Sequence, residues 1–156
     1  MKVLLTGSSK GIGYKIAQDL LAKGHELALH YNKNESPLED LLKSDDKTGS
    51  FSIRADLSKQ EEIKKMVENT IDKLSFPDCI INNAGIAESA DISLDINSWS
   101  NMFDKTIDVN LKAPSLIFKE FVKYKREKKI NSRLRIINIA SRAAFRGEQQ
   151  DYISYA

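Results

Sequence analysis

Short apolar runs alternate along the chain with segments whose apolar residues recur at helical spacing. Five runs predict β-strands, at residues 3–6, 27–30, 51–55, 79–82 and 134–140. The last run is the richest in β-branched residues, so we expect it at the centre of the sheet. Because strands and helices alternate with short connections, the pattern predicts parallel strands joined by right-handed crossovers.

Helical patterns fill the intervals between the predicted strands. The first helix carries an apolar stripe of four residues: Ile12, Ile16, Leu20 and Leu21. Gly24 is placed to end that helix. Ser58 and Glu61 form a capping-box pattern that predicts the start of a second helix. A long helical region follows Asp95, with an expected break near Thr106.

The predicted fold is a single α/β domain over residues 1–156, a Rossmann-type doubly wound parallel sheet with helices on both faces. A chain of 156 residues is long enough for one sizeable core. Segment 32–48, rich in Ser, Asp, Lys and Asn, is expected to be flexible or variable. In such folds ligands bind beyond the carboxyl ends of the strands, and the polar motifs described next follow predicted strands.

Composition narrows the classes of partner. A formal net charge of +2 is too small to indicate nucleic acid or a membrane surface. No run approaches the ~20 apolar residues of a membrane span. The single cysteine, Cys79, excludes an intramolecular disulfide and fits a reducing compartment. We therefore expect a cytoplasmic protein with no nucleic-acid partner, no membrane partner and no metal site.

Three glycines follow the first predicted strand. Gly7 permits a tight turn, Gly11 lets backbone approach a pyrophosphate, and Gly13 lets the helix lie close to the sheet. Exposed N–H groups and the helix dipole favour phosphate at such a turn. A plain strand-to-helix turn is the alternative. The cofactor-binding residues predicted here are Gly7, Ser9, Lys10, Gly11, Ile12 and Gly13.

The glycine spacing is Gly-x3-Gly-x-Gly. The Gly-x-Gly-x2-Gly pattern and the Gly-Lys-Ser/Thr end of a P-loop are absent, which argues against an NTPase. A second motif, Asn-Asn-Ala-Gly at residues 82–85, ends the fourth predicted strand. Its Asn amides can tie adjacent strand ends together, although Asn and Gly also form simple turns.

Together with Asn110, Ser141 and Tyr155, these motifs resemble the short-chain dehydrogenase/reductase family, in particular 3-oxoacyl-ACP reductase-like members. The resemblance covers the whole chain as the N-terminal part of a typical member. It implies an NAD(P)H-dependent oxidoreductase that reduces a small-molecule carbonyl to an alcohol, or the reverse, and a homo-oligomer for a full-length form. It also places Asn83, Ala84 and Gly85 beside the cofactor. The glycine spacing argues against a sugar-nucleotide epimerase.

The resemblance implies three catalytic residues. The Asn110 carbonyl, freed because Pro114 has no N–H, would hold a water of a proton relay. The Ser141 hydroxyl would bind the substrate carbonyl. Tyr155, 14 residues after Ser141, would act as general acid, and Tyr152 fits that spacing less well.

In the family a Lys follows this Tyr by four residues, whereas residue 156 is the last here. We therefore expect a domain that is incomplete at its C-terminal side, as a fragment or a naturally truncated chain, with apolar surface exposed on one face of the sheet. The alternative function is a nucleotide-binding module without turnover.

The end of the second strand bears on the choice of nicotinamide cofactor. An acidic residue there would bind the ribose 2′-OH of NAD. Here Asn32 and Lys33 follow the strand, and no carboxylate occurs before Glu35, which also argues against a methyltransferase. Because Lys33 and Lys10 suit a 2′-phosphate, we expect NADP rather than NAD.

Asp56 and Leu57 follow the third predicted strand. The resemblance implies that the Asp56 carboxylate and the Leu57 backbone contact the adenine. The competing interpretation is that Asp56 or Ser58 only caps the following helix.

Overall fold

A five-stranded, fully parallel sheet forms the centre of the molecule. The computed structural model describes residues 1–45 and 48–156. The strands are β1 (Lys2–Leu5), β2 (Glu26–Tyr31), β3 (Phe51–Arg54), β4 (Cys79–Asn82) and β5 (Arg135–Asn138). Their order is β3-β2-β1-β4-β5, and every neighbouring pair is parallel. The predicted doubly wound fold and its five strands are confirmed.

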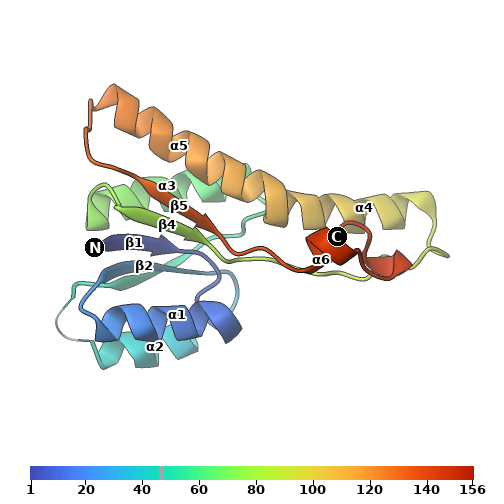
Figure 1. The fold of residues 1–156 in the computed structure, drawn as a ribbon, viewed down its shortest axis with the longest axis horizontal. Coiled ribbons are helices and arrows are strands. Elements are labelled where there is room, and N and C mark those ends of the chain that lie inside the picture. The colour runs from blue at the N-terminus through green and yellow to red at the C-terminus, as the bar shows by residue number, and fades with distance from the viewer. Residues whose placement is uncertain (46–47) are drawn as a thin grey trace.

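Helices cover both faces of this sheet (Figure 1). Helices α1 (Gly11–Ala22) and α2 (Ser36–Lys43) lie on one face, and α3 (Gln60–Leu74) and α5 (Ala113–Glu127) lie on the other. Helix α4 (Ile96–Ile107) extends past the carboxyl edge of the sheet and joins α5 through a π-helical turn, Asp108–Lys112. This turn is the predicted break in the long helical region. A short helix, α6 (Ala143–Arg146), and a 3-10 turn, Gln150–Tyr152, follow β5.

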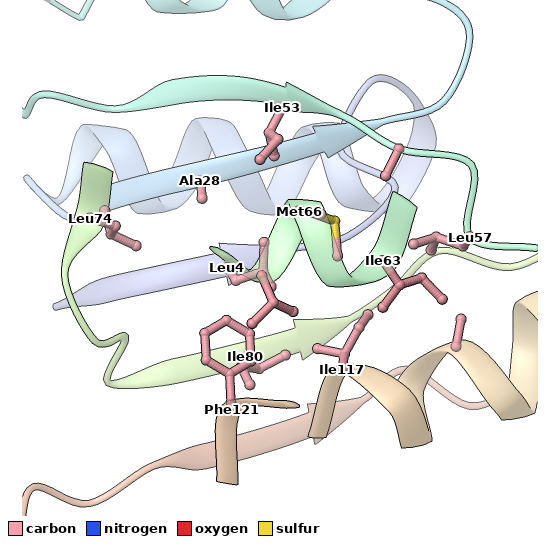
Figure 2. Close-up of a cluster of buried hydrophobic side chains, with 13 residues drawn as sticks. Leu4, Ala28, Ile53, Leu57, Ile63, Met66, Leu74, Ile80, Ile117 and Phe121 are labelled. Carbon is pink, nitrogen blue, oxygen red and sulfur yellow. The ribbon is translucent and has the colours of Figure 1, made fainter. Parts of the chain in front are cut away.

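Two apolar clusters fill the spaces between the sheet and its helices. Figure 2 shows the larger one, in which Leu4 and Ile80 of the sheet face Met66 of α3 and Phe121 of α5. The side chains of the other sheet face, among them Leu5, pack against α1 and α2. Because parallel strands are buried on both faces, β1 and β4 are apolar at consecutive positions rather than at alternate ones.

Strand β5 lies at the edge of the sheet, so the prediction that it is central is wrong. β-branched residues favour the extended backbone, but they do not decide which strands become neighbours. Ile136 packs against the cluster beneath α5, whereas Ile137 and Ile139 are 45% and 41% exposed. The expected exposed apolar surface is therefore present on β5.

Helix α1 packs most of the predicted stripe against the sheet: Leu21 is buried, and Ile16 and Leu20 are partly buried against the same cluster. The stripe is wrong at Ile12, which is 66% exposed, and the buried face also includes Gly13 and Ala17. The small residues let the helix lie close to the strands. Ile12 lies in the first turn, at the carboxyl edge of the sheet, where no layer covers it.

Helix α3 begins without the predicted capping box. Its N-cap is Lys59, which makes no side-chain capping hydrogen bond. The Ser58 hydroxyl donates instead to Asp56 Oδ1, and Glu62 Oε2 accepts from the Asp56 amide. The carboxylate that accepts from the backbone before the helix therefore belongs to Glu62, one residue after the predicted Glu61.

We expected a flexible or variable segment at residues 32–48, but the structure has helix α2 there. Pro37 in the first turn fixes a helical φ, and Leu38 is fully buried against the sheet. Positions 46 and 47 of the segment lie outside the described residues. Within the described residues, no helix is long and apolar enough to cross a membrane.

Phe121 is the residue on which we expect this core to depend most. Phe121→Ala removes a fully buried ring between α5 and the sheet, and should lower the free energy of unfolding by about 3–5 kcal/mol. Phe118, on the same helix, is 48% exposed, so Phe118→Ala should cost about 0.5 kcal/mol or less. Urea titration followed by circular dichroism measures both. Equal losses for the two variants would contradict this assignment of the core.

Candidate functional site

The glycine-rich turn packs directly against the end of β4. Gly7 has a φ of +66°, and a Cβ there would lie 2.8 Å from Ala84 Cα. A Cβ at Gly13 would lie 2.2 Å from the Gly7 oxygen and 2.4 Å from Asn83 Nδ2. A Cβ at Gly11 would meet no heavy atom within 4 Å, although its φ of +56° still favours glycine. Gly7 and Gly13 are thus required by packing, while Gly11 lies on the open side of the turn.

Hydrogen bonds join the end of β1 to the end of β4. Thr6 Oγ1 accepts from the amides of Asn83 and Ala84, both at 3.0 Å. In return, Asn83 Nδ2 donates to the Thr6 and Gly7 carbonyls, again at 3.0 Å. The expectation that the Asn amides tie strand ends together is confirmed. Both hydrogen bonds that Asn83 Nδ2 donates are therefore made within the protein.

The same motif also reaches β5. Asn82 Nδ2 donates to Asn138 Oδ1 at 2.8 Å, and the Ile139 amide donates to the Asn82 carbonyl at 2.9 Å. Asn82 Oδ1 is buried and accepts no hydrogen bond. These contacts fix the register of β5 at the edge where Ser141 follows.

Asn110 lies in the π-helical turn between α4 and α5. Its Nδ2 donates to the Ile86 carbonyl at 2.7 Å, and its Oδ1 accepts from the Ile86 amide at 2.9 Å. The side chain therefore holds the turn against the segment that follows β4. Pro114 has no N–H to donate to the Asn110 carbonyl, so that backbone oxygen is the group suited to a water.

The adenine side of the expected site lies beyond β2 and β3. Asn32, Lys33 and Lys10 are exposed, and Lys10 is the N-cap of α1. Arg54 Nε donates to the Asn32 carbonyl at 3.1 Å. Three cationic side chains therefore lie on the segments that flank this part of the edge. Sequence reasoning missed Arg54, because only the fold brings the end of β3 beside the loop after β2.

Glu35, the first carboxylate after β2, makes two hydrogen bonds. Its Oε2 accepts from the Tyr31 hydroxyl at 2.6 Å and its Oε1 from the Ser52 hydroxyl at 2.5 Å. These bonds lower the pKa of Glu35, with that of Ser52 the larger cause. Burial, followed by the bond to Glu35, raises the pKa of Tyr31 to about 12. Glu35 therefore stays ionised and turned toward β2 and β3.

Asp56 and Leu57 follow β3. Asp56 Oδ1 accepts from the Ser58 amide at 3.0 Å and from the Ser58 hydroxyl at 2.7 Å, and this hydroxyl is the largest cause of the lowered pKa of Asp56. Neither Asp56 nor Ser58 caps α3, so the capping interpretation is wrong. Leu57 is buried in the core, which leaves its backbone for a ligand. The adenine role of this pair stays a prediction.

Ser141 and Tyr155 lie on the segment after β5. Ser141 Oγ accepts from the Ala143 amide at 3.2 Å, and the Tyr155 amide donates to the Tyr152 carbonyl at 3.0 Å. The Ala90 amide donates to the Asp151 carbonyl at 2.8 Å, which holds this segment beside the one that follows β4. Within the described residues, no hydrogen bond joins Ser141, Tyr155 and Asn110. Helix α6 and the C-terminus lie past the carboxyl edge of the sheet (Figure 1).

A buried histidine completes the site, and sequence reasoning treated it only as the end of the second strand. His30 Nδ1 accepts from the Gly7 amide at 3.0 Å. Its Nε2 lies 3.0 Å from the Ala55 carbonyl. The available signal was a polar ring within an apolar strand, immediately before the loop that approaches the glycine turn.

Known proteins share this architecture. The chain is 32% identical over 111 residues to the 3-oxoacyl-[acyl-carrier-protein] reductase FabG of Staphylococcus epidermidis, a match that covers 70% of this chain and 44% of that protein. Among solved structures, a 4-hydroxyisoleucine dehydrogenase complexed with NADH is 30% identical, with a TM-score of 0.82. The FolM alternative dihydrofolate reductase 1 of Brucella canis, complexed with NADP, is 24% identical, with a TM-score of 0.83, and supports the fold alone.

Each of these two structures is matched over 99% of this chain and 60% of its own. The chain thus spans less than half of the curated relative and about three-fifths of the solved structures. Residues 1–156 match the short chain dehydrogenase family from end to end. The glycine turn, the Asn-Asn-Ala-Gly segment and this match agree, and the chain belongs to the short chain dehydrogenase family.

Proposed function

We propose that this chain is the nucleotide-binding part of an NAD(P)H-dependent oxidoreductase that interconverts a carbonyl and an alcohol on a small molecule. The observation that carries the proposal is the glycine turn, locked against β4 by Gly7 and Gly13 and open at Gly11. The curated relatives are named as reductases, which supports the same reaction class. The proposed setting is the cytoplasm, and the proposed assembly is a homo-oligomer of the full-length form.

The residues at the carboxyl edge fit a dinucleotide. The first N–H groups of α1 have no helical partner, and its first turn carries no acidic side chain, so a pyrophosphate fits beside Gly11 and Ile12. Asn83, Ala84 and Gly85 would border the nicotinamide ribose. Asp56 and Leu57 would border the adenine. When bound, the cofactor supplies or accepts a hydride.

Residues of the chain would bind and protonate the carbonyl oxygen of the substrate. The Ser141 hydroxyl would hydrogen-bond the carbonyl oxygen and orient it. The Tyr155 hydroxyl would give that oxygen a proton, a step that typically contributes ~10²–10⁴-fold. A water held by the Asn110 carbonyl would belong to the proton relay that restores the proton to the Tyr155 oxygen. Because the Staphylococcus relatives are 3-oxoacyl reductases, a 3-oxoacyl thioester is the first substrate class that we propose.

NADP is the proposed form of the cofactor. Lys10, Lys33 and Arg54 supply positive charge near the expected 2′-phosphate. Glu35, the nearest carboxylate after β2, is held by Tyr31 and Ser52. A bound 2′-phosphate would therefore meet cations rather than a free carboxylate. The relatives include complexes with NADPH, NADP and NADH, so the preference rests on these side chains.

The proposed function predicts both binding and turnover. Titration with NADPH, followed by its fluorescence, should show saturable binding, and in a full-length form the absorbance at the reduced-nicotinamide band should fall when a 3-oxoacyl thioester is added. Tyr155→Phe should retain binding and lower the rate about 10²-fold or more, since the phenolic proton is removed. Binding without any turnover over a panel of ketones would limit the function to nucleotide binding. No binding by a folded chain would overturn the proposal.

The cofactor preference predicts unequal effects of charge removal. Lys33→Ala and Arg54→Gln should each weaken NADPH binding about tenfold, or about 1.4 kcal/mol, and leave NADH binding nearly unchanged. Lys23→Ala is the matched control, because Lys23 is an exposed lysine at the opposite end of α1. Isothermal titration calorimetry with both cofactors measures the effect. Equal losses for NADPH and NADH would contradict a role in 2′-phosphate recognition.

A further inference from the structure

His30 is a buried imidazole at the junction of three strands' carboxyl ends. It lies one residue before the end of β2 and is 2% exposed. One ring nitrogen, Nδ1, receives the Gly7 amide of the turn after β1, and the other, Nε2, faces the Ala55 carbonyl after β3, each at 3.0 Å. The ring therefore bridges the expected pyrophosphate side and the expected adenine side of the site.

The Gly7 amide and the Ala55 carbonyl determine which ring nitrogen of His30 carries the proton. A backbone amide can only donate a hydrogen bond and a carbonyl can only accept one. Nδ1 must therefore carry a lone pair and Nε2 must carry the proton, which is the neutral Nε2–H tautomer. A protonated ring would place an N–H against the Gly7 N–H, where no acceptor exists.

The backbone of His30 holds the same turn. Its carbonyl accepts from the Ser8 amide at 2.9 Å and from the Ser8 hydroxyl at 2.8 Å. Gly7 is thus held at its amide nitrogen by His30 and at its carbonyl oxygen by Asn83. Because the Gly7 oxygen also lies where a Cβ of Gly13 would be, the start of α1 packs on the group that His30 orients.

We propose that His30 is a positioning residue for the dinucleotide site, whose neutral ring holds the glycine-rich turn in its phosphate-binding shape and whose protonation releases it. The inference rests on the proposed function, because it concerns the same cofactor site. The His30 side chain would then link Gly7 to Ala55, and acidification would weaken cofactor binding.

The surroundings of the ring set the direction of this sensitivity. Burial, the largest cause, lowers the pKa of His30, while the bond to Ala55 and the charge of Asp56 act in the opposite direction. Asp56 is the charged group that faces the ring. Three other charged groups lie on the elements around it. Lys10 of the turn is exposed, and Arg54 at the end of β3 is exposed and donates to the Asn32 carbonyl. Lys59, the N-cap of α3, pairs with Asp56 and Glu62.

Because the folded-state pKa lies below the unfolded value of about 6.5, the unfolded chain binds more protons as the pH falls. The contribution of the neutral ring is therefore present in full above about pH 6.5 and is lost on acidification below it. Loss of cofactor binding should follow in the same direction.

Two amides separate the roles of the two ring nitrogens. An Asn side chain places its polar atoms near the position of Nδ1, so His30→Asn keeps an acceptor for the Gly7 amide. A Gln side chain reaches the position of Nε2, so His30→Gln keeps a donor for the Ala55 carbonyl and leaves the Gly7 amide without an acceptor. A buried amide without a partner is destabilising, so the Gln variant should disturb the turn more.

The experiment titrates the wild-type chain and both variants with NADP⁺ by calorimetry at pH 7.5 and at successively lower pH for as long as each protein stays folded. At pH 7.5 we expect His30→Asn to bind within about twofold of wild type and His30→Gln about tenfold more weakly. On acidification, wild type should lose several-fold more affinity than His30→Asn. Titration of the cofactor phosphate occurs in both proteins, so the difference between them isolates the imidazole.

Nitrogen-15 NMR of the wild-type ring is a second readout, which needs neither a variant nor a cofactor. The Nε2–H tautomer at pH 7.5 is the expected result. A ring protonated on Nδ1, or a His30→Gln protein that binds NADP⁺ as tightly as wild type, would overturn the positioning role while leaving the proposed function intact. Failure of the folded wild-type chain to bind NADP⁺ at pH 7.5 would instead overturn the proposed function, and this inference with it.

Discussion

At the carboxyl ends of β1 and β4, the backbone at Gly7 lies so close to Ala84 that a side chain at position 7 would not fit. Gly7 faces Ala84 across this contact, and the Thr6 hydroxyl accepts both amides that begin the loop after β4. A methyl group at Gly13 would overlap the Gly7 oxygen. Because these polar groups are satisfied within the protein, the N–H groups left over are those on the open side of the turn. The proposed binding of phosphate at this edge would be a consequence of this packing.

On the expected adenine side, some charged side chains are also held by hydrogen bonds within the protein, and others are exposed. Glu35 is ionised but is held by two hydroxyls from β2 and β3, whereas Arg54 contacts only a loop carbonyl through Nε. Lys10 and Lys33 remain exposed. Exposed cationic side chains therefore lie beyond β2 even though the net charge of the chain is only +2. Selectivity between nicotinamide cofactors would arise from which charges are already paired rather than from how many are present.

Sequence periodicity predicted the strands and the glycine turn, because both depend on interactions within a few residues. It did not predict which strands become neighbours, so β5 was placed at the centre rather than at the edge. Ile12 was assigned to the core because helical spacing does not show where the sheet ends. The roles of His30 and Arg54 were missed for the same reason, since their partners lie on other strands. Patterns within a short stretch of sequence identify helices and strands, whereas the candidate site is formed by residues from several of them.

The two halves of the site are stabilised by different kinds of contact. The nucleotide half is held by hydrogen bonds among the ends of β1, β2 and β4, with Gly7 at their centre. The catalytic half follows β5, where Ser141 bonds its own turn and Tyr155 lies on a segment tied back through Asp151. The two halves are joined at Asn82, whose side chain donates to Asn138 Oδ1 and whose carbonyl accepts from the Ile139 amide. In the proposed function, turnover would therefore depend on this junction and on the segment that holds Tyr155, whereas cofactor binding would depend mainly on the hydrogen bonds around Gly7.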